Sequence, residues 1–321
     1  MRENDWHDSQ WRAGADGWIR ARLTRLGTPV TGAVEEIRVR PWSVTYRVAT
    51  NAGVRWFKAN ITTCAYEAGL AEALAGWVPG RVLAPLAVDR VRGWLLTADA
   101  GPTLRDQLDG ASPEKLLDTW ATMLREYAVL QRAVAGRADE MVALGVPDVR
   151  PATMPDHLAA LLADPDVRRG LEPAPVEAIR PAFAAWCAEL AADGIPATLQ
   201  HDDLTDANVF ADGRFFDWGD AGVAHPFGSL LVALGFAAHL LGLTTGAPEI
   251  TRLRDAYLEP WSDLAPPADL RRSVSLAVRT ARVSRALAWQ RALHNAALPV
   301  DDDFRTAAAY WLGETPAPSP I

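Results

Sequence analysis

Apolar and polar residues alternate in the first third of the chain and adopt helical spacing in the remainder. Between residues 33 and 60, three alternating runs, "VEEIRVR", "SVTYRVAT" and "VRWFKA", surround a turn at Asn51–Gly53. Such alternation is typical of strands with one buried face. "RVLAPLAVD" and "RGWLLTA" predict two more strands, so this part of the chain should contain about five.

Helical spacing occurs once within this strand-rich part and dominates from Ser112 onward. "TCAYEAGLAEALAGW" predicts one helix, because Tyr66, Leu70 and Leu74 would share a face. Ser112 can cap a long helix with Pro113 at its first position. Further helices are predicted over residues 155–163, 175–193, 227–243, 250–258, 267–295 and 303–312.

These elements predict an α+β fold with two lobes. Residues 1–100 would form a small N-terminal lobe, with an antiparallel sheet of about five strands and one helix. Residues 101–321 would form a larger, mostly helical C-terminal lobe. The Gly-Pro break in "AGPTLRD" puts the junction near Asp99–Thr103.

Composition and charge narrow the classes of function. The net charge of -8 argues against a nucleic-acid partner and is weakly favourable for a cationic substrate. No apolar run is long enough to span a membrane, and the charged first residues do not resemble a signal peptide. Cys64 and Cys187 fit no metal or disulfide spacing, so we expect a cytoplasmic protein without membrane partners.

Lysine usage singles out one residue. Of the 32 basic residues only Lys58 and Lys115 are lysines; the others are arginines. Because the chain uses arginine for most positive charges, a lysine inside a strand suggests a need for a compact point charge. Lys58, at the end of the third predicted strand, is such a residue.

The stretch "LQHDDLTDANVFADGRFFDWGD", residues 199–220, combines acidic residues with strand-like apolar groups. His201, Asp203 and Asn208 have the spacing H-x-D-x-x-x-x-N, and Asp217 follows nine residues after Asn208. Phosphoryl transfer needs a carboxylate to orient the attacking hydroxyl, and an amide and a second carboxylate to hold Mg²⁺. A predicted hairpin around Asp212–Gly213 would bring Asn208 and Asp217 to one end, where one metal ion could bind both.

On these motifs, "HDDLTDAN" and "DW", the chain resembles the aminoglycoside phosphotransferase and choline kinase branch of the protein-kinase-like fold, over roughly residues 30–300. The resemblance implies that Asp203 is the catalytic base and that Asn208 and Asp217 are the metal ligands. It implies that His201 braces the loop. We expect Asp202, where the family often has glycine, and Asp206 to serve only the polarity of the loop.

The same resemblance implies a nucleotide site in the N-terminal lobe. Lys58 would bind the α- and β-phosphates, held by Glu67, with Glu72 as the competing partner. The backbone near Thr97 and Asp99 would bind the nucleotide base. The glycine-rich loop of kinases is absent. The corresponding turn, "RPWSVTYRV", would cover the phosphates with Ser43 and its neighbour Trp42.

The expected activity is Mg²⁺-dependent transfer of the γ-phosphoryl group of ATP or GTP to a hydroxyl of a small molecule. The acceptor could be an aminoglycoside-type antibiotic, or a sugar, amino sugar or amino-alcohol metabolite. Two alternatives remain: a non-catalytic kinase-like binding module, and a metal-dependent phosphohydrolase prompted by "HD" at His201–Asp202. The oligomeric state is not indicated by the sequence.

Overall fold

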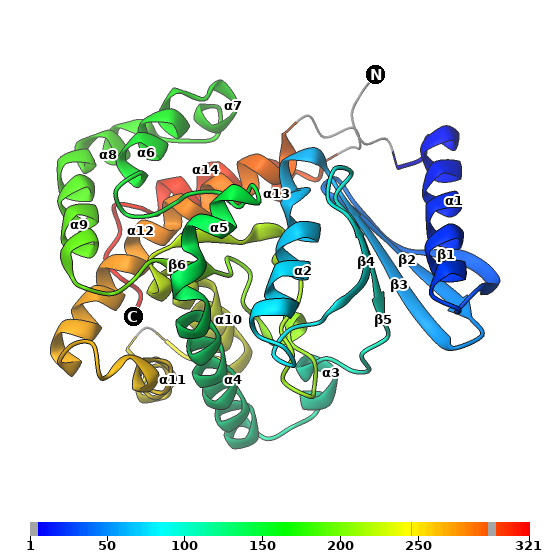
Figure 1. The fold of residues 1–321 in the computed structure, drawn as a ribbon. Helices are drawn as coiled ribbons and strands as arrows, with labels where there is room; N and C mark the ends of the chain where they lie inside the picture. Colours follow the sequence, from blue (N-terminus) through cyan, green and yellow to red (C-terminus); the bar gives the residue numbers. More distant parts are fainter. Residues whose placement is uncertain (1–5, 245, 295–299) are drawn as a thin grey trace. The chain divides into compact units, whose positions relative to one another are not determined.

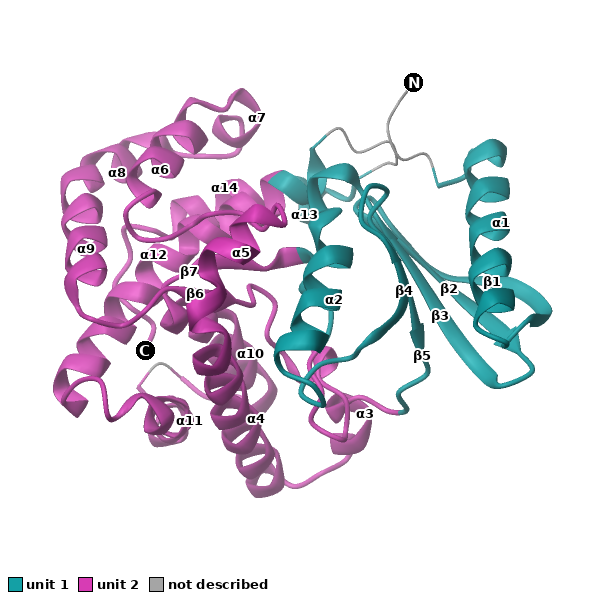
Figure 2. Ribbon diagram, in the orientation of Figure 1, with its two compact units in different colours: residues 1–101, 216–219, 291–305 teal, residues 102–215, 220–290, 306–321 magenta. Residues whose placement is uncertain are grey.

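The computed structural model describes residues 6–244, 246–294 and 300–321. It divides into two compact units, coloured in Figure 2. Unit 1 comprises residues up to 101 together with 216–219 and 291–305. Unit 2 comprises residues 102–215, 220–290 and 306–321.

Unit 1 is built on an antiparallel sheet that, within the described residues, has five strands in the order β1-β2-β3-β5-β4 (Figure 1). The strands are β1 (Val30–Arg40), β2 (Ser43–Thr50), β3 (Gly53–Asn60), β4 (Pro85–Asp89) and β5 (Trp94–Ala98). Consecutive strands are joined by short turns except between β3 and β4, where the helix α2 (Tyr66–Trp77) intervenes.

One face of this sheet is apolar and is covered by a helix that precedes it, α1 (Ser9–Arg25). Asp8 caps α1 by accepting a hydrogen bond from the Trp11 amide at 2.7 Å. The covering contacts come from the helix positions Ala15, Trp18, Ile19 and Leu23 and from the sheet positions Val44, Tyr46, Val48, Phe57, Ala59, Trp94 and Leu96. This core fixes which residues of each strand face the opposite side, where α2 lies (Figure 2).

Unit 2 is mostly helical. Its helices are α3 (Leu104–Leu108), α4 (Pro113–Val134), α5 (Ala138–Ala143), α6 (Met154–Ala163), α7 (Pro165–Arg168), α8 (Pro173–Ala178), α9 (Arg180–Ala192), α10 (Leu230–Leu241), α11 (Pro248–Leu258), α12 (Pro267–Leu293, to Gln290 within this unit) and α14 (Ala307–Gly313). One further short helix, α13 (Asp302–Arg305), belongs to unit 1.

Two short antiparallel strands, β6 (Thr198–Gln200) and β7 (Gly222–Ala224), bracket the acidic stretch. Side chains of helix α4 are hydrogen-bonded to β6. Tyr127 Oη donates to the Leu199 carbonyl at 3.1 Å, and Gln131 Nε2 donates to the same oxygen at 2.7 Å. Since both side chains are buried, these bonds fix the start of the acidic stretch against a rigid helix.

The predicted α+β fold, with a five-stranded antiparallel sheet followed by a mostly helical region, is confirmed. The capped helix after Ser112 is also confirmed, because Ser112 accepts from the Lys115 amide and α4 begins at Pro113. None of the helices in the described ranges combines the length and apolar character needed to cross a bilayer.

Several sequence predictions were wrong in detail. The helix predicted over 303–312 is two helices, α13 and α14. The helix α1 was missed, because Gly14 and Gly17 weaken its helical signal. The predicted helix over 175–193 is two helices, since Pro181 can follow a helix start but cannot continue α8. The predicted hairpin is reduced to a single bridge between Val209 and Phe215.

Two leucines of α1 test its packing role. Leu23 is fully buried, whereas Leu26, at the end of α1, is 46% exposed. We expect Leu23→Ala to lower the free energy of unfolding by about 2–5 kcal/mol, because it leaves a cavity. We expect Leu26→Ala to change it by about 0.5 kcal/mol or less. Urea denaturation measures both, and equal effects would contradict the packing of α1 on the sheet.

Candidate functional site

Lys58 forms a partly buried ion pair on the side of the sheet that faces away from α1. Its Nζ donates to Glu67 at 2.7 and 2.9 Å and to Asp217 Oδ1 at 2.6 Å. Glu67 is on α2, and Asp217 belongs to the short segment 216–219 of unit 1. One lysine thus holds together a strand, a helix and a loop segment.

The structure pairs Lys58 with Glu67 and not with Glu72. Glu72 forms its own ion pair with Arg90 at 2.6 Å, and both of those side chains are about half exposed. Glu67 also accepts from Asn60 Nδ2 at 2.7 Å. Sequence reasoning missed Asn60. Its position two residues after Lys58 on the same strand, and therefore on the same face, was the available signal.

Four charged groups meet around Lys58. Glu67 and Asp217 supply two negative charges, Lys58 supplies one positive charge, and Arg38, 3.9 Å from Asp217, supplies a second. Burial alone would lower the pKa of Lys58, but the two carboxylates outweigh burial and raise its pKa above the ordinary value. Lys58 is therefore charged at neutral pH.

Asp217 has an unusual backbone. Its φ of 66° makes it the one non-glycine residue of the described ranges with positive φ. The segment is held in this shape by α2. The Trp218 amide donates to Glu67 Oε1 at 3.2 Å, and Tyr66 Oη donates to the Gly219 carbonyl. A Cβ on Gly219 would lie 3.1 Å from Glu67 Oε2, which explains the glycine. Local strain of this kind is concentrated at functional positions.

The residues predicted to bind nucleotide share one face of the sheet. Strand register places Ser43 opposite Asn60, and Thr97 opposite Trp56, which is two residues from Lys58. Ser43 and Thr97 are buried. Asp99 follows β5, is exposed and accepts from Trp56 Nε1 at 3.3 Å. Its amide donates to Val54, so its carbonyl would be the backbone group left for a nucleotide base.

Arg38 adds a positive charge on the same face. Its strand position is paired with Thr45, and Thr45 is paired with Lys58, so the three side chains project to one side. Arg38 Nη2 lies 3.9 Å from Asp217 Oδ2. The sequence lacks a glycine-rich loop, and Arg38 was not singled out, because arginines are numerous in this chain.

In unit 2, Asp203 is hydrogen-bonded to both other residues of the H-x-D-x-x-x-x-N pattern. Asn208 Nδ2 donates to Asp203 Oδ2 at 3.0 Å and to the Asp203 carbonyl at 2.7 Å. The Asp203 amide donates to His201 Nδ1 at 3.2 Å. His201 is fully buried, whereas the Asp203 side chain is 41% exposed. The loop therefore presents one accessible carboxylate on a buried support.

The expectation that Asp202 and Asp206 serve only loop polarity was wrong, because both are buried. Asp202 accepts from Ser284 Oγ at 2.6 Å and from Gln200 Nε2. Asp206 accepts twice from Arg105, at 2.8 and 3.0 Å. Hydrogen bonds to buried carboxylates offset their desolvation, so these residues anchor the loop.

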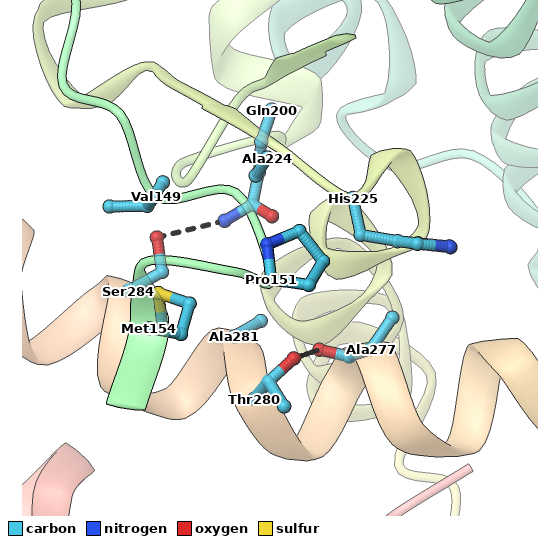
Figure 3. A pocket seen from close by; sticks show the side chains of 10 residues that line it. All are labelled: Val149, Pro151, Met154, Gln200, Ala224, His225, Ala277, Thr280, Ala281 and Ser284. Carbon is cyan, nitrogen blue, oxygen red and sulfur yellow. Dashed lines mark hydrogen bonds between the residues drawn. The ribbon is translucent and has the colours of Figure 1, made fainter. Parts of the chain in front are cut away.

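A small cavity lies behind this anchor (Figure 3). Gln200 and Ser284 point toward each other across its wall and are hydrogen-bonded at 3.0 Å. Its other lining side chains come mainly from the 149–154 segment and from α12. A Cβ on Gly228 would lie only 2.0 Å from Gln200 Oε1, so this glycine allows Gln200 to reach Asp202.

Arg285 and Asp220 were also missed by sequence reasoning. Arg285, on α12, contacts Asp203 Oδ1 at 3.2 Å and Asp220 Oδ2 at 2.8 Å. An arginine among apolar helix positions such as Val283 and Ala286 was a possible signal, but its partners are far away in the sequence.

The chemistry of the available donors fits Mg²⁺. The amide nitrogen of Asn208 donates to Asp203, which leaves its carbonyl oxygen as the group that a metal would take. Asp217 offers carboxylate oxygens. Among the described residues, no three acidic, histidine or cysteine side chains gather as a metal cage. Mg²⁺ typically needs only one or two protein oxygens beside phosphates and water.

Solved structures share this fold. The GDP and kanamycin complex of APH(2")-IIia is 15% identical, with a TM-score of 0.58 over 93% of this chain and 98% of that one. A choline/ethanolamine kinase family protein from Mesorhizobium loti is 20% identical, with a TM-score of 0.60 over 94% and 93%. An ethanolamine kinase of Plasmodium vivax is 13% identical, with a TM-score of 0.63 over 88% and 82%.

A search of curated proteins found no match. A family profile, in contrast, matches most of the sequence. The profile of the phosphotransferase enzyme family aligns with residues 5–272, a range that includes Lys58, Asp203 and Asp217. The chain therefore belongs to the phosphotransferase enzyme family.

Proposed function

We propose that the protein transfers the γ-phosphoryl group of ATP or GTP to a hydroxyl of a small molecule, using Mg²⁺. The observation that carries this proposal is the partly buried ion pair of Lys58 with Glu67 and Asp217. A lysine held in this way by a helix glutamate is the phosphate-binding arrangement of kinases. Its family membership supports the same reaction class.

In this proposal Lys58 binds the α- and β-phosphates, and Glu67 holds its ammonium group in place. Asn208 and Asp217 are the proposed ligands of Mg²⁺, which would neutralise charge on the nucleotide phosphates when bound. They lie in different units, and their assignment rests on their spacing in the sequence and on their oxygen donors. Ser43, Thr97 and Asp99 are the proposed nucleotide contacts of the sheet face.

Asp203 is the proposed catalytic base. Its carboxylate is partly exposed, while Asn208 holds one of its oxygens, so it can accept a hydrogen bond from an incoming hydroxyl. Because phosphoryl transfer has a loose transition state, orientation of that hydroxyl matters more than early proton removal. His201 supports the loop by accepting from the Asp203 amide.

Two classes of acceptor remain in view. APH(2")-IIia was solved with GDP and kanamycin, and APH(2")-IIa with streptomycin and ATP, which favours an aminoglycoside-type acceptor. The ethanolamine kinase of P. vivax and the choline/ethanolamine kinase family protein favour an amino alcohol or a related metabolite. The net charge of -8 suits the cationic members of both classes.

The acceptor screen should use MgATP and MgGTP with aminoglycosides, amino sugars and choline-like alcohols, and it should measure formation of nucleoside diphosphate. We expect acceptor-stimulated turnover that EDTA abolishes. The phosphorylated product should be seen by mass spectrometry. Absence of both nucleotide binding and turnover with every acceptor would contradict the proposed function.

Asp203 and its two acidic neighbours provide a test of the base. We expect Asp203→Asn to lower turnover by roughly 10²-fold or more, with nucleotide affinity little changed. Asp206→Asn should mainly weaken the ion pair with Arg105, lowering the free energy of unfolding by about 1–3 kcal/mol. Turnover per folded molecule should be nearly preserved in Asp202→Asn and Asp206→Asn.

This comparison requires turnover, nucleotide affinity and thermal stability for all three variants under the same conditions. The assignment of Asp203 fails if Asp202→Asn is the inactive variant and Asp203→Asn remains active. The His-Asp hydrolase alternative would then have to be reconsidered.

Two glutamates on α2 test the nucleotide clamp, by which we mean Lys58 held in place by Glu67 for phosphate binding. Glu67→Gln should weaken MgATP use by about tenfold or more, since Lys58 loses a charged partner that positions it. Glu72→Gln should have little effect, because exposed ion pairs such as Glu72–Arg90 contribute about 0–1 kcal/mol. Lys58→Arg should not restore the activity lost in Lys58→Ala, because a planar guanidinium replaces a compact ammonium. Titration calorimetry and steady-state kinetics measure these effects, and a larger loss in Glu72→Gln would refute the clamp.

A further inference from the structure

A buried arginine connects two acidic segments of unit 2. Arg285 lies on α12, and its side chain is only 9% exposed. Its Nη2 contacts Asp203 Oδ1 at 3.2 Å, and its Nη1 contacts Asp220 Oδ2 at 2.8 Å. A single guanidinium thus bridges the proposed catalytic loop and the residue that follows the segment 216–219.

This bridge completes the support of the Asp203 carboxylate. Asn208 Nδ2 donates to one oxygen, Oδ2, at 3.0 Å, and Arg285 donates to the other, Oδ1. A carboxylate with a donor on each oxygen cannot rotate about its terminal bond without losing one of them. The pair therefore fixes the direction in which the exposed edge of Asp203 meets a hydroxyl.

The guanidinium itself is held by few contacts. Its Nε is buried and has no hydrogen-bond partner among the described residues. The plane lies near the ring of Trp289, at 5.3 Å from the centroid. Its surroundings are thus the two carboxylates with which it pairs, the nearby carboxylate of Asp202 and one ring. The desolvation of a buried arginine is unfavourable, and both of its ion pairs are needed to offset this cost.

We propose that Arg285 is a positioning residue for phosphoryl transfer, which holds the Asp203 carboxylate in its productive orientation from the α12 side. This inference rests on the proposed function of Asp203. Arginine suits the task because its planar fork reaches two separate carboxylates, whereas a lysine ammonium offers a single point of contact. Through Asp220, Arg285 also ties this orientation to the chain immediately after the segment of Asp217.

The test compares Arg285→Lys, Arg285→Gln and Asp220→Asn with the wild-type protein. We expect Arg285→Gln to lower kcat by about 10- to 100-fold, because a misplaced catalytic group loses orientation. Arg285→Lys and Asp220→Asn should lose less. The Kd for MgATP and the KM of the best acceptor should stay within about threefold, since neither binding site is removed. If the screen yields no acceptor, phosphate release from MgATP to water is measured instead.

Arg282 offers a matched control on the same helix. It is also buried, but its guanidinium donates to the backbone carbonyls of Glu314, Ala317 and Pro318. Arg282→Lys removes comparable buried hydrogen bonds away from Asp203. We expect it to lower the melting temperature while kcat per folded molecule remains unchanged.

Crystal structures of the Arg285 variants provide a readout that does not depend on activity. The Asp203 carboxylate should be rotated or in two orientations in Arg285→Gln, and unchanged in Arg282→Lys. An unchanged kcat in folded Arg285→Gln would overturn the proposal. A raised acceptor KM with normal kcat would overturn it too, because Arg285 would then bind substrate. Equal loss of kcat in Arg282→Lys would show a merely structural role.

These outcomes separate the two proposals. A wild-type protein that neither binds nor consumes MgATP would refute the proposed function. The orientation of Asp203 in the crystal structures would still decide whether Arg285 holds this carboxylate.

Discussion

The arrangement of unit 1 depends on a partly buried lysine held between two carboxylates. Removing Lys58 from water is unfavourable, and only the close oxygens of Glu67 and Asp217 offset that cost. Those oxygens come from α2 and from the segment 216–219, so the ion pair requires both to be in place. The apolar face under α1 sets the strand register that turns Lys58 to the other side.

In the acidic stretch of unit 2, close polar partners likewise offset the cost of removing charged side chains from water. Asp202 accepts hydrogen bonds from Ser284 and Gln200, and Asp206 forms an ion pair with Arg105. These two buried acids anchor the loop and let its apolar residues pack. Asp203 is the partly exposed one, and both of its oxygens have donors. The chain therefore separates the buried acids that hold the loop from Asp203, whose side chain is partly exposed.

Much of this could be predicted from local pattern. The alternation of apolar and polar residues predicted the strands. The scarcity of lysine singled out Lys58, and the spacing of Asp203 and Asn208 indicated the proposed catalytic loop. The contacts of Arg285 could not be predicted, because they join residues 65 and 82 positions apart that only the tertiary fold brings together. The burial of Asp202 could not be predicted either, since its partner Ser284 is far away in the sequence, on α12. Helix α1 was missed because its glycines obscured a regular apolar spacing.

The central claim is that Asp217 is held beside Lys58 in order to bind the metal of a phosphotransferase. The most direct measurement is MgATP-dependent turnover of Asp217→Ala, with folding checked by circular dichroism. Asp212→Ala is the control, since Asp212 lies in an exposed turn, where it pairs with Arg214. The account predicts that Asp217→Ala stays folded and keeps roughly a hundredth of wild-type turnover or less, while Asp212→Ala is fully active. Wild-type turnover in folded Asp217→Ala would contradict it.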